Sequence, residues 1–325
     1  MSTAARGGIY LKRYLAPIAD ALARPDVTDI YINRPGELWL EASGGQIEKI
    51  DAPDLDEATL SRLASQVAAL SHQGINREHP LLSAKLPDGS RIQVVAPPAT
   101  RGAMALAIRK QIAPTLTLAD YEKAGLFAEV GMHRDGKQAL ALLVSEKRYA
   151  QALSLAVRER KNILVAGGTS TGKTTFLNAL LREVPPKERL ILIEDTPEIT
   201  VQHDNHVGLV AVRGELGEAK VTANDLVAAS LRMRPDRIIL GELRGDEAFA
   251  FLRAVNSGHP GSMTTIHADS PDGAVEQLVL LVLQSGTRLD RSDIRHYIKS
   301  TIDVFVQLGR KNGKRIVEEI VFGHA

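Results

Sequence analysis

The chain has 325 residues, of which 44% are hydrophobic, and this is enough for two domains with cores of their own. Its 40 Lys and Arg residues balance 39 Asp and Glu residues, so no overall field attracts nucleic acid or an acidic membrane. The absence of cysteine excludes disulfides and cysteine-ligated zinc. The longest apolar runs, such as Leu278–Leu283, are far shorter than the roughly 18 residues that cross a bilayer, and the N-terminus lacks the apolar core of a signal peptide. We therefore expect a soluble, intracellular protein whose membrane contacts are peripheral.

Residues 1–125 are expected to form a small α+β domain. Alternating apolar residues around a Pro-Gly turn predict a hairpin, and an apolar face at helical spacing predicts a helix that follows it. The expected elements are a helix over 11–22 that Pro17 kinks or shortens, strands over 28–33 and 37–41, a helix over 56–72, and strands over 91–95 and 104–109. The next stretch is irregular and contains Pro and Gly, and we expect the approximate linker at 126–137.

Residues 138–325 are expected to form a second, α/β domain. A mostly helical stretch over 138–160 precedes a series of short apolar runs that alternate with helical patterns. The expected strands cover 162–166, 190–193, 207–212, 237–240, 263–267, 303–308 and 316–322. This alternation indicates a mostly parallel sheet with helices on both faces, in which ligands bind beyond the carboxyl ends of the strands.

The segment Gly167–Thr174 reads Gly-Gly-Thr-Ser-Thr-Gly-Lys-Thr and matches the phosphate-binding loop G-x-x-x-x-G-K-[ST] in full. It lies between an apolar strand and a helix, as this loop requires. Positive φ angles are expected at Gly167, Gly168 and Gly172, so that backbone N–H groups surround an anion. Lys173 is expected to reach the β- and γ-phosphates and Thr174 to ligate Mg²⁺. The expected ligand is ATP·Mg²⁺, and the expected binding residues are Gly167, Gly168, Thr169, Ser170, Thr171, Gly172, Lys173, Thr174 and Thr175.

Carboxylates follow two further strands of the second domain. Glu194 and Asp195 come after the strand over 190–193, and Glu242 comes after the strand over 237–240. Glu242 is the residue that we favour for positioning the attacking water, with Glu194 as the second candidate. Many ATPases of this kind carry Asp-Glu at the second position, whereas this chain has Gly241 before Glu242. Mg²⁺ is therefore expected to depend on Thr174, phosphate oxygens and waters, with help through water from Glu194, Asp195 or Glu242.

His267 ends a further strand and is expected to contact the γ-phosphate. The role of His259, in the turn before that strand, is left open. Arginines are candidates because phosphoryl transfer spreads negative charge over several oxygens. Spacing alone favours solvated charges for all six candidates, which are Arg91, Arg109, Arg232, Arg234, Arg237 and Arg244.

Together these motifs resemble the secretion ATPase superfamily, whose four boxes occur here in order. The boxes are the phosphate loop Gly167–Thr174, the acidic box Ile193–Glu198, the strand box Arg237–Glu242 and the histidine box Gly258–His267. The segments Ser230–Glu242 and Gly258–Ser262 are most similar to the type IV secretion traffic ATPases, in particular to the eleventh component of VirB-type systems. Ile32–Glu37 and Leu86–Gln93 extend the resemblance into the first domain.

The resemblance implies a RecA-like P-loop domain and a hexameric ring on the cytoplasmic face of the inner membrane. It implies as partners the inner-membrane components of the secretion machine and a coupling ATPase, and no sequence-specific binding of nucleic acid. It also implies that nucleotide binds between the two domains, where Arg91 and Arg109 reach the phosphates, and that Glu194, Glu242 and His267 act in turnover. Three alternatives stay open: a type II secretion or pilus ATPase, a DNA translocase, and a nucleotide-binding scaffold that does not hydrolyse.

Overall fold

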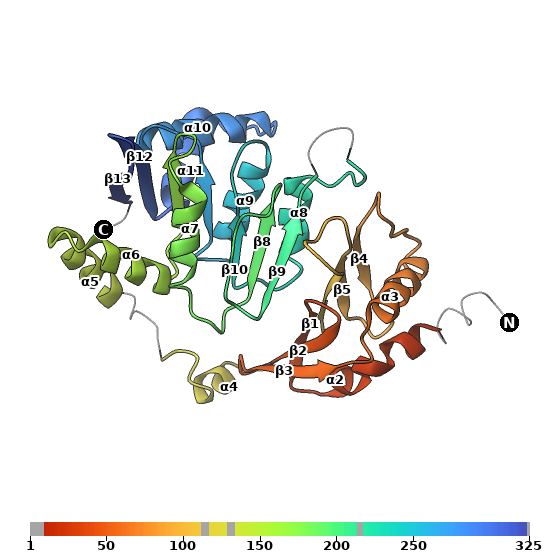
Figure 1. Ribbon diagram of the computed structural model, residues 1–325. Helices are drawn as coiled ribbons and strands as arrows, with labels where there is room; N and C mark the ends of the chain where they lie inside the picture. Colours follow the sequence, from red (N-terminus) through yellow and green to blue (C-terminus); the bar gives the residue numbers. More distant parts are fainter. Residues whose placement is uncertain (1–9, 112–116, 129–133, 213–216, 324–325) are drawn as a thin grey trace.

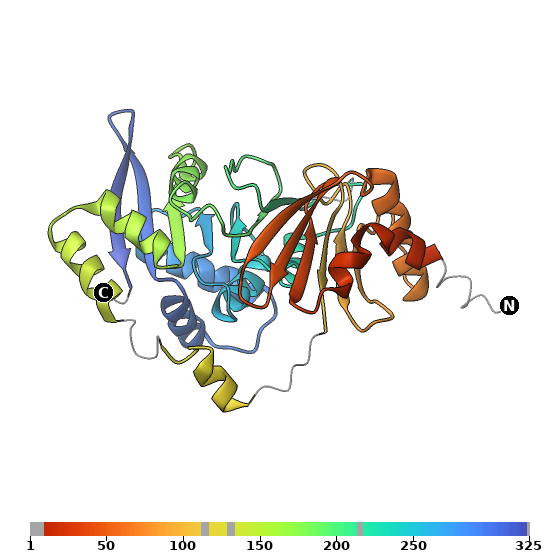
Figure 2. The same ribbon diagram turned by 90° about the horizontal axis from the view of Figure 1, so that it is seen from below.

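The computed structural model describes residues 10–111, 117–128, 134–212 and 217–323. Two β-sheets lie side by side in the molecule, one built from the first third of the chain and one from the last half (Figure 1). The view from below shows α4 (Leu118–Lys123), drawn in yellow, at the lower edge of the picture and apart from both sheets (Figure 2). Within the described residues, no helix combines the length and apolarity that crossing a bilayer requires.

The first sheet has six strands in the order β3-β2-β1-β6-β5-β4, and every neighbouring pair is antiparallel. The strands are β1 (Val27–Ile32), β2 (Gly36–Ala42), β3 (Ile47–Ala52), β4 (Leu81–Lys85), β5 (Arg91–Val95) and β6 (Ala105–Arg109). The predicted hairpin and the two later strands are confirmed. The sequence did not predict β3 and β4, which are the two edge strands of this sheet.

Helix α3 (Glu57–Leu70) buries one apolar face in the core of this domain. It begins where predicted, because the Asp56 carboxylate accepts a hydrogen bond from the Thr59 N–H and caps the helix. The predicted N-terminal helix is broken at Pro17. There a 3₁₀ segment, η1 (Ala16–Ile18), precedes α2 (Ala19–Ala23), because proline can start a helical turn but cannot continue one.

In its described parts, the connection between the sheets contains three helices, α4 (Leu118–Lys123), α5 (Arg134–Ser145) and α6 (Tyr149–Arg158). Helix α4 has no buried residue. Helix α5 begins within the predicted linker 126–137, of which residues 129–133 lie outside the described residues. The domain boundaries therefore stay a prediction.

The second sheet has seven strands in the order β13-β12-β7-β11-β10-β8-β9. All neighbouring pairs are parallel except β12 with β13, which forms an antiparallel hairpin at one edge. The strands are β7 (Ile163–Gly167), β8 (Leu190–Glu194), β9 (His206–Val210), β10 (Arg237–Leu240), β11 (Met263–Ile266), β12 (Val304–Lys311) and β13 (Lys314–Phe322). The predicted α/β domain with a mostly parallel sheet is confirmed.

Helices cover both faces of this sheet. Alternate residues of β7 enter different cores, with Leu164 on the face of α8 (Ala223–Ser230) and Val165 on the face of α7 (Lys173–Leu181). The first face also carries α9 (Glu247–Asn256), α10 (Pro271–Gln284) and α11 (Arg291–Thr301). This two-sided burial explains why the strands of the second sheet are continuous apolar runs.

The first domain packs against the β9 edge of the second sheet. Thr100 forms a β-bridge with Leu209, and the Arg101 N–H donates to the Gly208 carbonyl at 2.9 Å. Tyr31 of the first domain belongs to the same buried cluster as the apolar residues of the second sheet. The two sheets therefore share part of one core.

Candidate active site

Four motifs meet at one edge of the second sheet. The phosphate loop follows β7, the histidine box ends after β11, Glu242 follows β10, and the acidic box follows β8. These four strands are neighbours in the sheet, so their carboxyl ends lie together. A cavity of about 440 Å³ opens there, and among its lining residues are Lys173, Glu194, Glu242 and His267.

Two residues of the phosphate loop have left-handed backbone conformations. Gly172, the N-cap of α7, has φ +93°, and Ser170 has φ +60°. The predicted positive φ is found at Gly172, whereas the prediction is wrong for Gly167 and Gly168. Gly167 is needed for another reason, because a Cβ there would lie 2.5 Å from Thr171 Oγ1 and 2.9 Å from the Leu308 carbonyl oxygen.

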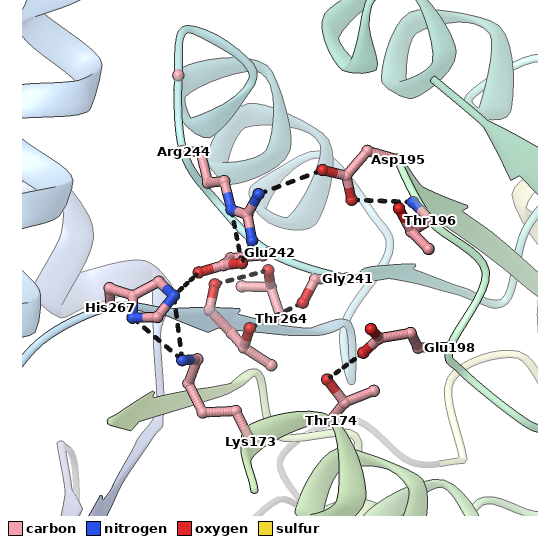
Figure 3. Close-up of polar contacts among 12 residues, drawn as sticks. Lys173, Thr174, Asp195, Thr196, Glu198, Gly241, Glu242, Arg244, Thr264 and His267 are labelled. Carbon is pink, nitrogen blue, oxygen red and sulfur yellow. Dashed lines mark hydrogen bonds and ion pairs between the residues drawn. The ribbon is translucent and has the colours of Figure 1, made fainter. Parts of the chain in front are cut away.

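The Lys173 ammonium group closes over its own loop. Its Nζ donates to the carbonyls of Gly167 at 3.0 Å and Gly168 at 3.3 Å. It also lies 3.3 Å from Nδ1 of His267 and 3.4 Å from Nε2 (Figure 3). Burial lowers the pKa of Lys173, whereas the nearby Glu242 carboxylate acts in the opposite direction. A bound phosphate would replace these neutral partners with negative charge.

Glu242 lies at the centre of a chain of polar contacts. His267 Nε2 lies 2.8 Å from one carboxylate oxygen, and Arg244 Nε donates to the other at 2.6 Å (Figure 3). Arg244 also approaches Asp195, with 3.3 Å between Nη1 and Oδ2. The Glu242 hydrogen bond raises the pKa of Arg244. The side chain of Glu242 is 12% exposed at the wall of the cavity, so its carboxylate is held in place and still reaches the cavity.

Glu194 has other partners than Glu242, and they lie in the acidic box and in the first domain. Its Oε1 accepts hydrogen bonds from the backbone N–H groups of Glu198 and Ile199, both at 2.8 Å. Its Oε2 forms an ion pair with Arg101 from the first domain, and Arg101 also donates to the Ile199 carbonyl at 2.8 Å. Glu194 is buried and holds the turn that carries the acidic box.

The glycine before Glu242 has a steric explanation. Gly241 donates its N–H to the Ile193 carbonyl at 2.8 Å, which brings it against the base of the Glu194 side chain. A Cβ at Gly241 would lie 3.0 Å from Glu194 Cγ. An aspartate at this position would compete with Glu194 for the same space.

The oxygen atoms around Thr174 suit a magnesium ion. The Thr174 hydroxyl donates to Glu198 Oε2 at 3.2 Å, and Asp195 and Glu242 line the same cavity. Hydroxyl and carboxylate oxygens are the ligands that Mg²⁺ prefers, and it keeps several of its waters. Over the described ranges, no group of three or more His, Cys, Asp and Glu side chains is arranged to hold a metal by itself. The side chains thus fit an ion that is held by Thr174, nucleotide phosphates and water.

The candidate arginines do not share one location. Arg244 lines the cavity of the phosphate loop. Arg237 is fully buried and donates to Glu188, with 2.6 Å between Nε and Oε2. Arg234 forms ion pairs with Glu41 and Asp236. Arg234 and Arg237 therefore have structural roles. Arg232 is exposed in the turn after α8 and donates to the Ala228 carbonyl of that helix at 3.2 Å.

Arg91 and Arg109 lie on the first sheet, at the start of β5 and at the end of β6. They face each other across β5 and β6. Arg109 lines a cavity together with Arg160 and Asp236, which precede β7 and β10. That cavity lies at the amino ends of the parallel strands, roughly 15 Å from their carboxyl ends. The structure therefore does not bring these two arginines to the phosphate loop of their own chain. His259 lines the same cavity and hydrogen-bonds to the Ala254 carbonyl at 3.0 Å.

Three side chains at the site were missed by sequence reasoning. The sequence pattern places Glu198 in the acidic box without a role of its own, whereas in the structure its carboxylate accepts a hydrogen bond from Thr174. Arg101 lies in a loop without a motif, and Arg315 lies in the exposed β12–β13 hairpin. No local pattern marks these two arginines, because each reaches the site through tertiary contacts only.

The fold and the site define a P-loop nucleotide-binding protein of the RecA-like kind. The family profile described as "Type II/IV secretion system protein" matches residues 12–319. The chain belongs to this family, and the resemblance inferred from the four boxes is confirmed.

Relatives from three organisms show how far this likeness extends. The chain is 40% identical to the type IV secretion system protein VirB11 of Bartonella quintana (strain Toulouse), over 95% of this chain and 91% of that protein. It is 40% identical to the type IV secretion system protein PtlH of Bordetella pertussis (strain Tohama I), over 92% of this chain and 90% of that protein. The crystal structure of the VirB11 ATPase from the Brucella suis type IV secretion system, in complex with sulphate, superposes with a TM-score of 0.91. It has 37% sequence identity and covers 98% of this chain and 96% of that chain.

Proposed function

We propose that this chain is a Mg²⁺-dependent ATPase that powers a type IV secretion system as a homohexamer on the cytoplasmic face of the inner membrane. The observation that carries the proposal is the meeting of Lys173, His267 and Glu242 in one cavity at the phosphate loop. Support also comes from relatives along nearly the whole chain that are described as type IV secretion proteins. The related Brucella suis ATPase is described in complex with sulphate, which has the charge and shape of a phosphate group.

In the proposed reaction, water attacks the γ-phosphate of ATP in line with the leaving ADP oxygen. Lys173 exchanges its two carbonyl partners for oxygens of the β- and γ-phosphates. Glu242, held by Arg244 and His267, orients the attacking water and accepts its proton. Mg²⁺, when bound beside Thr174, neutralises charge on the phosphates. Glu194 keeps the acidic box in place, because both of its oxygens already have partners.

The direct test of this proposal is Mg²⁺-dependent ATP hydrolysis by the purified chain, measured together with its mass in solution. We expect turnover by a species of six subunits. Lys173→Ala is expected to lower turnover at least about tenfold, because the site loses its contact to the transferred phosphate. Lys187→Ala, which removes an exposed lysine that does not line the phosphate-loop cavity, is the matched control and is expected to leave turnover unchanged. Equal hydrolysis by parent and Lys173→Ala would show that the loop is not the catalytic site.

Partners and cargo need separate measurements. We propose that the ring contacts inner-membrane components of the secretion machine and a coupling ATPase, and that it binds no specific nucleic acid sequence. Copurification with type II or pilus assembly components instead would contradict the assignment to type IV secretion. Stimulation of turnover by DNA would favour a DNA translocase, and nucleotide binding without hydrolysis would favour a scaffold.

We further propose that Arg91 and Arg109 act on a neighbouring subunit. Arg109 lines a cavity at the amino ends of the parallel strands and Arg91 pairs with it across β5 and β6, so neither contacts the phosphate loop of its own chain. In a ring, head-to-tail contacts bring different faces of neighbouring subunits together, so one subunit's first domain can complete the site of the next.

A mixing experiment tests this arrangement. We expect Arg109→Ala and Lys173→Ala each to be nearly inactive alone. When the two are mixed at equal amounts and allowed to reassemble, about a quarter of the sites hold both residues, so that fraction of parent turnover returns. Recovery that stays at the level of the separate variants contradicts action between subunits.

A further inference from the structure

The turn between β5 and β6 joins the first domain to the edge of the second sheet. The Val210 N–H donates to the Ala99 carbonyl at 2.9 Å. The Arg101 N–H donates to the Gly208 carbonyl, also at 2.9 Å. A Cβ on Gly208 would overlap Arg101 Cδ and would lie 2.7 Å from its Cγ and Nε, so this glycine of β9 leaves room for the arginine. The Arg101 side chain therefore crosses β9 and reaches the end of β8, the next strand of the sheet.

The Arg101 guanidinium contacts the acidic box near its start and just beyond its end. It forms an ion pair with Oε2 of Glu194, and its Nη1 donates to the Ile199 carbonyl at 2.8 Å. Glu194 is buried, and its other oxygen accepts from the N–H groups of Glu198 and Ile199. Residues 195–205 lie wholly within the described part of the chain and form neither helix nor strand. The place of the acidic box therefore depends on these side-chain contacts.

The acidic box also contacts the residue beside which Mg²⁺ is proposed to bind. The Thr174 hydroxyl donates to Glu198 Oε2 at 3.2 Å (Figure 3). The side-chain amide of Asn178, in α7, donates to the Glu198 carbonyl at 3.4 Å and accepts from the Thr200 N–H at 3.0 Å. A continuous path of contacts thus leads from the first domain through Arg101 and the acidic box to the start of α7.

We propose that Arg101 is a positioning residue of the ATPase reaction, which couples the place of its own first domain to Glu198 and Thr174 and so to the binding of Mg²⁺. This inference rests on the proposed function. It gives the first domain a role in the site of its own chain, beside the role of Arg91 and Arg109 in the site of a neighbour. Arg101 does not line the phosphate-loop cavity, so it acts through the acidic box rather than on the phosphates.

The path predicts which step depends on Arg101. Side chains that hold the ligands of a metal ion in place set much of the affinity for that ion. Without Arg101, Glu194 becomes a buried carboxylate that has lost its cation, and the acidic box is free to rearrange. Lys173 and the loop amides are untouched, so the contacts to the phosphates remain. The expected signature is a higher Mg²⁺ requirement with little change in the affinity for nucleotide alone.

The test measures turnover of the full chain against Mg²⁺ concentration, and ADP affinity by calorimetry with Mg²⁺ or with a chelator in its place. For Arg101→Ala we expect the Mg²⁺ concentration at half-maximal turnover to rise about tenfold or more. ADP affinity is expected to fall about tenfold with Mg²⁺ and to change about threefold or less without it. Arg101→Lys is expected to recover part of the loss, because it keeps the charge beside Glu194 but lacks the planar group that also reaches Ile199.

Two further variants separate this path from the domain contact as a whole. Gly208→Ala displaces the Arg101 side chain without removing its charge, and the strand backbone of Gly208 accepts alanine. It is expected to raise the Mg²⁺ requirement as Arg101→Ala does, and it carries the test if Arg101→Ala does not fold. Arg77→Ala is the matched control, because Arg77 joins the two domains through an exposed ion pair with Glu218 that is not part of the path. Its Mg²⁺ requirement is expected to equal that of the parent.

The outcomes distinguish this inference from the function on which it rests. An unchanged Mg²⁺ requirement in Arg101→Ala and Gly208→Ala would overturn the inference and leave the proposed function standing. An equal effect of Arg77→Ala, or a loss of ADP affinity that is the same with and without Mg²⁺, would also overturn it. A parent chain that does not hydrolyse ATP contradicts the proposed function itself.

Discussion

Replacing Glu242 by Gln is expected to lower the turnover number for ATP about 10²- to 10⁴-fold while ADP still binds. The amide keeps the shape of the side chain and can still contact Arg244 and His267, but it cannot accept the proton of the attacking water. Because Lys173 and the loop amides are untouched, the ground-state contacts to the phosphates remain. Turnover measured in single-turnover mode and ADP affinity measured by calorimetry separate the two effects.

Two further variants make this result specific. Asp269→Asn removes an exposed carboxylate that follows the histidine box and lines no part of the phosphate-loop cavity, and its turnover is expected to stay within about twofold of the parent. Glu194→Gln is expected to act mainly on stability, since Glu194 pairs with Arg101 and accepts two backbone hydrogen bonds. A deeper loss of turnover in Glu194→Gln than in Glu242→Gln would reverse the roles of the two acids.

The second sheet was predictable because its strands are buried on both faces. Ile163–Ala166 is an unbroken apolar run, and its alternate residues enter cores on opposite sides of the sheet. Strand β3 gave no such signal, because Glu48, Lys49 and Asp51 lie on an edge strand that is partly exposed. Strand β4 is a short edge strand of mixed polarity, which a pattern of alternation cannot distinguish from a loop.

The site residues that belong to local sequence motifs were predictable. Four motifs, each at the end of a predicted strand, lie together because parallel strands end at one edge of the sheet. What the sequence could not predict depends on contacts between distant residues. The pairing of Arg101 with Glu194 and the packing of Arg315 on Gly172 are of this kind. Sequence patterns record neighbours along the chain, and neither pair has a fixed spacing.

The contact between the two domains centres on Arg189, and it could not be predicted from the sequence either. This arginine directly precedes β8 and its side chain is completely buried. Its Nη1 lies 2.5 Å from the side-chain oxygens of both Asn33 and Asn205, and its Nε donates to the Met233 carbonyl at 3.0 Å. The guanidinium carbon lies 4.2 Å from the centre of the Tyr31 ring. Burial lowers the pKa of Arg189 to about 10.

Arg189→Ala is therefore expected to lower the free energy of unfolding by about 3 to 5 kcal/mol. The exchange leaves the side-chain oxygens of Asn33 and Asn205 without their shared donor and opens a cavity beneath Tyr31. Urea denaturation of the full chain measures the loss. Trp39, the single tryptophan, is buried in the core that both domains share, so its fluorescence reports the opening of this contact directly.

The comparison with two other substitutions decides whether the loss comes from the buried contact. Arg182→Ala removes an exposed arginine at the end of α7 and is expected to change the free energy of unfolding by about 0.5 kcal/mol or less. Arg189→Lys keeps the charge but loses the planar group that contacts both asparagines, so an intermediate loss is expected. If Arg189→Ala unfolds at the same urea concentration as Arg182→Ala, Arg189 does not hold the domains together, and the apolar contacts around Tyr31 and Trp39 account for their association.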